Sequence, residues 1–151
     1  MTKPRVYDFA IIKYSNGAIP AVFTTLCGIT NVQVNETVET TDRRLRDCDK
    51  PNRPGVREVK VVGIDWTVTG SGATNGDVRT AVKANLLAKH VDYMIEYYED
   101  DNTDGGNLVG TDAGNGLMTA NNISVDADGD STWEITIEGS GELTYTAAPG
   151  S

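Results

Sequence analysis

The stretch from Gly28 to Gly72 constrains the fold most, because two long runs of alternating residues flank a basic loop within it. In the second run, one face carries Val62, Ile64, Trp66 and Val68, and the other carries Val61, Asp65, Thr67 and Thr69. In the first run, the apolar face carries Val32, Val34 and Val38, with Glu36 as an interruption, and the other face is wholly polar. A period of two is typical of a strand with one buried face. The stretch therefore predicts a long hairpin whose polar face needs a separate explanation.

The segment 41–57 is predicted to be a long loop between these strands. It contains Pro51 and Pro54, which fit neither a helix nor a strand ladder. Four acidic residues between Thr41 and Lys60 are outnumbered by seven basic ones, namely Arg43, Arg44, Arg46, Lys50, Arg53, Arg57 and Lys60. The segment thus carries +3 in a chain of −9, so the rest of the chain carries −12. A basic arm on an acidic body favours self-association through complementary patches, and an ordinary solvated loop is the alternative.

The composition is typical of one β-rich domain that covers residues 1–151. Its 151 residues are enough for one domain with a substantial core, and the apolar share of 38% makes that core lean. The net charge of −9 argues against a DNA-gripping surface, because contacts to phosphates need Lys and Arg. No apolar run approaches the roughly 20 residues of a membrane helix, and the N-terminus lacks the apolar core of a signal peptide. We therefore expect synthesis in a cytoplasm without membrane insertion.

Cysteine and histidine usage predicts no metal site and no cofactor. Cys27 and Cys48 are the only cysteines, and His90 is the only histidine. Without a secretory signal, free thiols are favoured over a disulfide, which stays open as an alternative. Two distant cysteines and one histidine give no zinc-ligand spacing.

The acidic segment that begins at Asp126 resembles the start of a calcium-binding loop. Asp126, Asp128 and Asp130 have the right spacing, but Ser131 takes the position of the required Gly and Ile137 that of the bidentate Glu. An Asp-Gly hairpin turn is the favoured interpretation. The sequence also lacks the hydrolase, P-loop, zinc-protease and CxxC motifs, and His90 has no partner pattern for a catalytic triad. We therefore expect no enzyme but a structural or binding protein.

The chain as a whole predicts a mainly β fold, an antiparallel β-sandwich or barrel of about seven or eight strands with one flanking helix. Besides the hairpin, strands are expected at 5–14, 91–99, 117–125, 132–138 and 142–146, with a short strand or loop at 107–110. The helix is expected to start from an N-cap at Thr74 or Asn75, to carry the apolar stripe Val78, Ala81, Val82 and Leu86, and to end near Lys89 and His90. The residues of the last strands expected in the core are Trp133, Ile135, Ile137, Leu143 and Tyr145.

The order of these elements resembles the major tail tube protein of long-tailed, non-contractile bacteriophages and of related gene-transfer particles. The residues that carry the resemblance are Cys27-Gly28-Ile29-Thr30, Glu36-Thr37, Thr41-Asp42-Arg43-Arg44, Arg46-Asp47-Cys48, Pro51, Pro54, Trp66 and Gly70-Ser71-Gly72. The similarity covers most of the chain, and its motifs are diffuse.

The resemblance implies a structural virion protein that is assembled in the host cytoplasm into a virion tail. Subunits would close into hexameric rings, rings would stack into a hollow tube, and DNA would pass through it without specific binding. The implied partners are further copies of the chain, the tape measure protein, the tail terminator and the tail-tip proteins. The basic residues Arg43, Arg44, Arg46, Lys50, Arg53 and Arg57 would form an arm to a neighbouring subunit or ring.

A polar face of the hairpin would line the lumen of such a tube. The candidate residues are Asn31, Gln33, Asn35, Thr37, Glu39, Asp65, Thr67 and Thr69, with Glu134 and Glu138 as further candidates that could instead face outward. Acidic walls would repel DNA phosphates, so the genome could slide. Periodicity alone leaves open whether this face points inward or forms the outer wall.

Two other readings compete with a tail tube. A carbohydrate- or receptor-binding β-sandwich on a virion surface would need an exposed aromatic platform, whereas Trp66, Trp133, Tyr93 and Tyr97 lie at positions suited to a core. The tube of contractile tails or of type VI secretion would share the fold but have a different outer partner.

Overall fold

The computed structural model describes residues 7–17, 22–73, 76–127 and 131–148. Its elements, in chain order, are β1 (Phe9–Ser15), β2 (Phe23–Thr25), β3 (Ile29–Leu45), β4 (Val56–Gly72), α1 (Gly76–Asn85), β5 (His90–Glu99), β6 (Asn107–Ser124) and β7 (Thr132–Ala147). The seven strands form one antiparallel sheet in the order β2-β1-β5-β6-β7-β4-β3. The sheet curls around a core but does not close, because β2 and β3 are its end strands. The predicted mainly β fold with a single helix is confirmed, in a sandwich-like rather than a barrel form.

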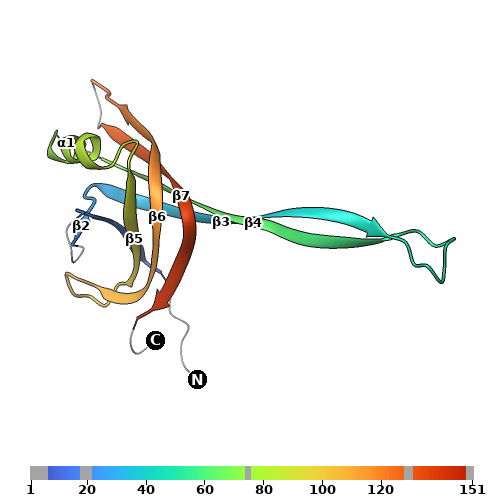
Figure 1. The fold of residues 1–151 in the computed structure, drawn as a ribbon. Coiled ribbons are helices and arrows are strands. Elements are labelled where there is room, and N and C mark those ends of the chain that lie inside the picture. The colour runs from blue at the N-terminus through green and yellow to red at the C-terminus, as the bar shows by residue number, and fades with distance from the viewer. Residues whose placement is uncertain (1–6, 18–21, 74–75, 128–130, 149–151) are drawn as a thin grey trace.

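The core lies on the inner face of the curled sheet, with α1 against it at one end (Figure 1). Its largest buried side chains come from every second position of the strands, as the alternation predicted, and Trp133, Ile135 and Ile137 are at most 2% exposed. Val82 and Leu86 of the predicted helical stripe are fully buried. Burial of these apolar side chains is the main force that holds the sheet in its curled shape.

The prediction that Tyr145 returns to the core is wrong. Tyr145 lies opposite Asp112 on the inner face of the sheet, but it is 49% exposed. It sits at the open end of the sheet, where its hydroxyl lies 3.3 Å from that of Tyr7. Leu143 is half-buried and packs against the core, as expected.

The last third of the chain forms two long strands instead of several short ones. β6 runs without a break through the glycines before Leu117, because β5 and β7 supply hydrogen-bond partners on its two sides. β7 likewise continues through the predicted break near Gly139. There Ser140 pairs with Asn115 and Thr144 pairs with Ala113, so β7 holds three residues where β6 holds one. This bulge absorbs the turn-forming glycines without ending the strand.

The predicted loop 41–57 is too long, since β3 continues to Leu45 and β4 starts at Val56. Two ion pairs support the extended ladder, since Arg43 binds the directly opposite Glu58 and Arg57 binds Asp42 on the diagonal. Only residues 46–55 remain as a loop, and both prolines lie in it. Figure 1 shows the outer part of this hairpin as an arm that projects from the rest of the molecule, called the body below.

The helix is shorter than predicted. It ends at Asn85, and His90 already belongs to β5. The chain turns between them through Ala88, which has a φ of 59°. Lys89 nevertheless stabilises the C-terminal end of the helix as expected, because its Nζ donates a hydrogen bond to the carbonyl of Ala84. The predicted N-cap residues, the first residues of the 5–14 strand and Asp128–Asp130 lie outside the described residues.

Candidate assembly surfaces

All ten predicted lumen-facing residues lie on one face of the sheet. Within the hairpin, Asn35 faces Thr67 and Thr37 faces Asp65, and directly opposed residues of an antiparallel pair share a face. Beyond the hairpin, Thr67 faces Glu138, which brings β7 onto the same surface. Every one of the ten is exposed or half-buried. Four of them are acidic and none is basic, so the β3–β4–β7 outer face is an acidic, hydroxyl- and amide-rich surface.

Sequence reasoning missed further members of this outer face. Ser71 lies opposite both Asn31 and Glu134, and Thr136 lies opposite Thr69. The alternation of β7 already placed Thr136 between the two predicted glutamates, so its period was the available signal. That β7 pairs with β4 could not be read from the sequence, because the two strands are separated by α1, β5 and β6.

The arm carries two cross-strand ion pairs. The Nε of Arg43 lies 3.0 Å from Glu58 Oε2, and the Nε of Arg57 lies 2.7 Å from Asp42 Oδ2. All four side chains are at least half exposed, so the pairs stabilise the ladder only modestly. The predicted basic arm residues therefore do not act as one group, since two of them neutralise acidic partners in their own hairpin.

The remaining basic residues are at the end of the arm. Arg44 Nη1 donates to the carbonyl of Gly55 at 3.4 Å. Arg46, Lys50 and Arg53 lie in the exposed loop, and none of them forms an ion pair within the part of the chain that the structure describes. The loop is shaped by turns around Asp47, whose Oδ1 accepts from the amide of Asp49 at 2.9 Å. With Asp47 and Asp49 in the same loop, residues 46–55 carry a net charge of +1, so the tip presents basic side chains without ion-pair partners and a small net positive charge.

One face of the arm is apolar and exposed. Val38 lies opposite Ile64, and Val61 lies opposite Thr40, the next residue of β3 on the same face. Val38, Ile64 and Val61 are 56%, 66% and 57% exposed, respectively. The predicted burial of Ile64 and Val62 is therefore wrong. These residues lie beyond the stretch of β4 that pairs with β7, which begins at Thr67.

A β-bulge changes which valines share this face. Glu39 pairs with Gly63 and Thr40 pairs with Val61, so Val62 is an extra residue of β4. The shift puts Val61 and Val59 on the side of Ile64, whereas plain alternation had put Val61 on the polar side. The apolar face of the body therefore continues along β4 of the arm as far as Val59, beyond which Arg44 and Arg57 lie on this face.

A groove with a volume of about 490 Å³ lies where this face leaves the body, and it is called the root groove below. Its lining residues are Glu36, Ile64, Trp66, Gly141, Glu142 and Leu143. The last three come from the bulge of β7. Trp66 is held in place because its Nε1 donates to the carbonyl of Gly141 at 3.1 Å. Its indole also lies so close to Gly139 that a Cβ there would come within 2.2 Å of the ring.

Tyrosines and carboxylates form a hydrogen-bonded group at the open end of the sheet. Tyr97 donates to Asp112 Oδ2 at 2.5 Å, and Tyr98 donates to Glu96 Oε2 at 2.6 Å. Glu96 also lies 2.6 Å from Lys13 Nζ, which compensates its burial. Burial and the hydrogen bond to Glu96 raise the pKa of Tyr98 to about 12, and burial and Asp112 raise the pKa of Tyr97. These groups stabilise the sheet, because each buried carboxylate has a donor.

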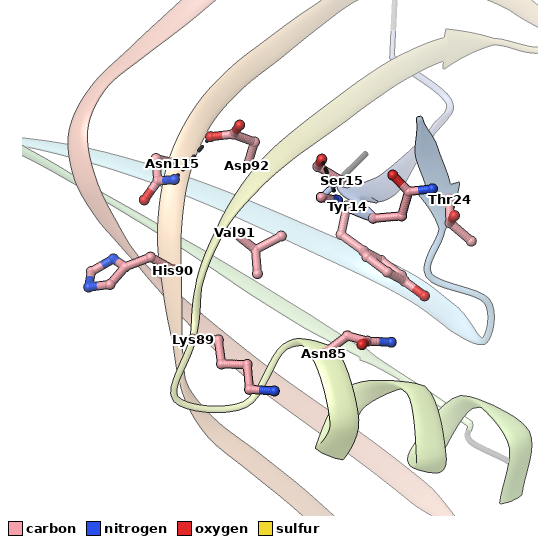
Figure 2. Close-up of a pocket in the computed structure, with 11 residues that line it drawn as sticks. Tyr14, Ser15, Thr24, Asn85, Lys89, His90, Val91, Asp92 and Asn115 are labelled. Carbon is pink, nitrogen blue, oxygen red and sulfur yellow. Dashed lines mark hydrogen bonds between the residues drawn. The ribbon is translucent and has the colours of Figure 1, made fainter. Parts of the chain in front are cut away.

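A second groove, of about 340 Å³, lies between α1, β1 and β5 and is drawn in Figure 2. The figure shows the ring of His90 pointing away from Tyr14 and Asn85 on the other side of this groove. Asp92 accepts a hydrogen bond from Asn115 Nδ2 at 3.0 Å. His90 and Asp92 therefore do not form a catalytic pair with a nucleophile among the lining residues.

The described residues offer no metal site, since no group of three or more His, Cys, Asp or Glu side chains is placed to hold an ion. Cys27 and Cys48 are exposed free thiols, so the alternative of a disulfide between them is not realised. Within the described ranges no helix is both long and apolar enough to cross a membrane. Trp66, Trp133 and Tyr93 are at most 3% exposed, so these rings form no surface platform for a carbohydrate.

Comparison with known proteins places the chain among tail tubes. A family model described as phage tail tube protein matches residues 9–145. No curated protein sequence matches the chain at a significant level.

Solved structures show the same fold at low sequence identity. The tail of an empty gene transfer agent particle, refined with C6 symmetry, is 17% identical, with a TM-score of 0.59 over 91% of this chain and 95% of that one. A sheath–tube complex of the extracellular contractile injection system PVC is 15% identical, with a TM-score of 0.66 over 98% and 95%. The SPP1 tail tube is 9% identical, with a TM-score of 0.55 over 96% and 80%.

Proposed function

The chain belongs to the phage tail tube protein family and is a structural protein of a tail tube, and from that premise we propose how its copies assemble. Copies of the chain close into hexameric rings, and the rings stack into a hollow tube through which DNA passes during ejection. The sixfold symmetry of the similar gene transfer agent tail supports the ring size. The role is structural rather than catalytic, and assembly takes place in the host cytoplasm.

The observation that carries this proposal is the open edge of β3. Among the described residues its 17 residues pair with β4 alone, so a row of backbone donors and acceptors along its other edge is left unpaired there. Within the same described ranges, β4 has no strand partner but β3 from Val56 to Trp66. Such long exposed edges promote uncontrolled pairing unless another chain covers them. Ring closure gives each edge a fixed partner, since a heterologous contact between identical subunits can repeat until the ring closes.

The β3–β4–β7 outer face lines the lumen in this proposal. Its polar side chains tolerate a water-filled bore, and its four carboxylates, at Glu39, Asp65, Glu134 and Glu138, repel DNA phosphates. The absence of basic residues among the predicted lumen residues removes the contacts that make proteins bind DNA tightly. The tape measure protein, a tail terminator and tail-tip proteins are the further partners of such a tube.

Electron microscopy of the purified chain, at high concentration and with tail-tip complexes as seeds, tests the assembly. We expect hollow tubes of uniform width. A chain that stays monomeric even with seeds would contradict the proposal and favour a binding module.

The lumen assignment is tested on the same tubes with a thiol at Thr67, in a variant that also carries Cys27→Ser and Cys48→Ser. We expect Thr67→Cys to react with a small maleimide before and after assembly, but with a maleimide attached to a large polymer only before assembly. Asp104→Cys, on the exposed loop after β5, is the matched control for a general change of reactivity on assembly. If Thr67→Cys in intact tubes reacted freely with the large reagent, this face would form the outer wall instead.

A further inference from the structure

We propose that the tip of the arm of one copy seats in the root groove of an adjacent copy. This inference rests on the proposed tube assembly and adds to it which surfaces of the two copies meet. Both surfaces are exposed and have no partner within the described chain. Both carry apolar side chains, and the charged side chains of the groove are acidic whereas the unpaired charged side chains of the tip are basic.

The root groove has an apolar floor and an acidic rim. Ile64 is 66% exposed, Leu143 is half-buried, and the Trp66 indole between them is fixed by its bond to Gly141. Glu36 and Glu142 are exposed at the rim, and neither forms an ion pair among the described residues. No basic side chain lines the groove. The surface therefore suits a partner that has an apolar centre and positive charge around it.

The arm tip has that arrangement. Leu45 and Val56 lie directly opposite each other at the last pair of the ladder and are 47% and 74% exposed. Arg46, Lys50 and Arg53 follow in the adjoining loop, are exposed and form no ion pair in the described chain, and with Asp47 and Asp49 they leave the loop at a net charge of +1. Docking would cover the aliphatic pair on the apolar floor and place the basic side chains near Glu36 and Glu142.

The tip must reach another copy because it is remote from its own groove. Strands rise about 3.3 Å per residue, so the ladder between Ile64 and Val56 separates tip and groove by roughly 25 Å. A compact chain of this size has a radius of gyration of roughly 15 Å, and Figure 1 shows the arm clear of the body along its length. One copy thus offers a tip at one place and a groove at another. Such a contact is heterologous, so it can repeat from copy to copy.

Charge reversal and rescue test the pairing under conditions in which the wild-type chain assembles. We expect Glu36→Lys with Glu142→Lys to raise the concentration needed for assembly by roughly tenfold or more, because the basic tip would meet positive charge. Arg46→Glu with Arg53→Glu should have the same effect. Combining all four substitutions should restore most of the assembly, since the attraction returns with its sign exchanged.

Asp101→Lys with Asp104→Lys is the matched control, because it makes the same charge change on an exposed loop that does not line the groove. The fold of each variant is checked by circular dichroism and by its unfolding midpoint. If the groove variant assembled like the wild type, or changed no more than this control, the pairing of tip and groove would be overturned.

A cross-link gives an independent readout. Cys48 lies in the tip loop, so a chain with Cys27→Ser and Leu143→Cys carries one thiol in the tip and one in the groove. Mild oxidation of its tubes should give a ladder of disulfide-linked multimers on a non-reducing gel, whereas the same chain with Cys48→Ser should not. Tubes without a ladder would overturn the inference and leave the proposed function standing. A wild-type chain that never assembles would overturn both.

Discussion

The inner and outer halves of the β3–β4 hairpin have the same pairing and the same alternation but different surroundings. In the inner half, residues 29–37 and 65–72, β7 adds a third strand and Val68 is fully buried. In the outer half, residues 38–45 and 56–64, no other strand of the described chain joins the pair, and Val61 is 57% exposed. The difference shows that alternation in a strand pair does not by itself bury a face, because burial also needs a neighbouring strand and the core behind it.

The largest difference in the free energy of unfolding should come from the same valine-to-alanine substitution made in each half of the hairpin. Val68→Ala removes two buried carbon groups, each worth about 0.8 kcal/mol, and leaves a cavity, so we expect a loss of roughly 2 kcal/mol or more. Val61→Ala should change the free energy of unfolding by less than about 0.5 kcal/mol, because the side chain is exposed. Urea unfolding of the unassembled chain measures both. Equal losses would mean that the arm is packed in solution.

Alkaline pH should destabilise the body but not the arm, because three tyrosines with raised pKa values lie in β5, a fourth, Tyr7, precedes β1, and the arm has no tyrosine. A pKa raised by folding stabilises the protein fully below the unfolded value of about 10. For Tyr98 this stability is lost as pH rises from about 10 through its folded pKa of about 12. The urea midpoint should therefore fall across that range, and less steeply in Tyr98→Phe. A slope unchanged by Tyr98→Phe and by Tyr97→Phe would contradict this origin.

The smallest effect is expected for the ion pairs of the arm. Arg43 and Glu58 are 71% and 50% exposed at their side chains, so their coupling should be about 0.2–1 kcal/mol and should shrink in high salt. A double-mutant cycle with Arg43→Ala and Glu58→Ala measures it. A coupling of several kcal/mol that salt does not reduce would show that the outer half is shielded from water.

The strands and the helix could be predicted from the sequence better than the burial of their faces could. Alternation placed Trp133, Ile135 and Ile137 in the core, because each strand carries its own period. It failed at Ile64 and Val61, since burial depends on where β7 stops pairing and on a bulge, and both arise from contacts distant in sequence.

Of the candidate surfaces, the polar face followed from periodicity alone. The root groove did not, because its two sides come from β4 and from the bulge of β7, which the sequence presents as a turn between two strands.

The bulge at Val62 also determines how the arm can change length in evolution. Loss of Val62 would leave Val61 opposite Thr40 and Val59 opposite Asp42, so the apolar side of the arm would stay as it is. Loss of Val59 with the bulge kept would instead move Glu58 onto that side and turn the rest of the strand over. Arms in related chains should therefore differ by even numbers of residues per strand, and a single-residue change should be tolerated only at the bulge.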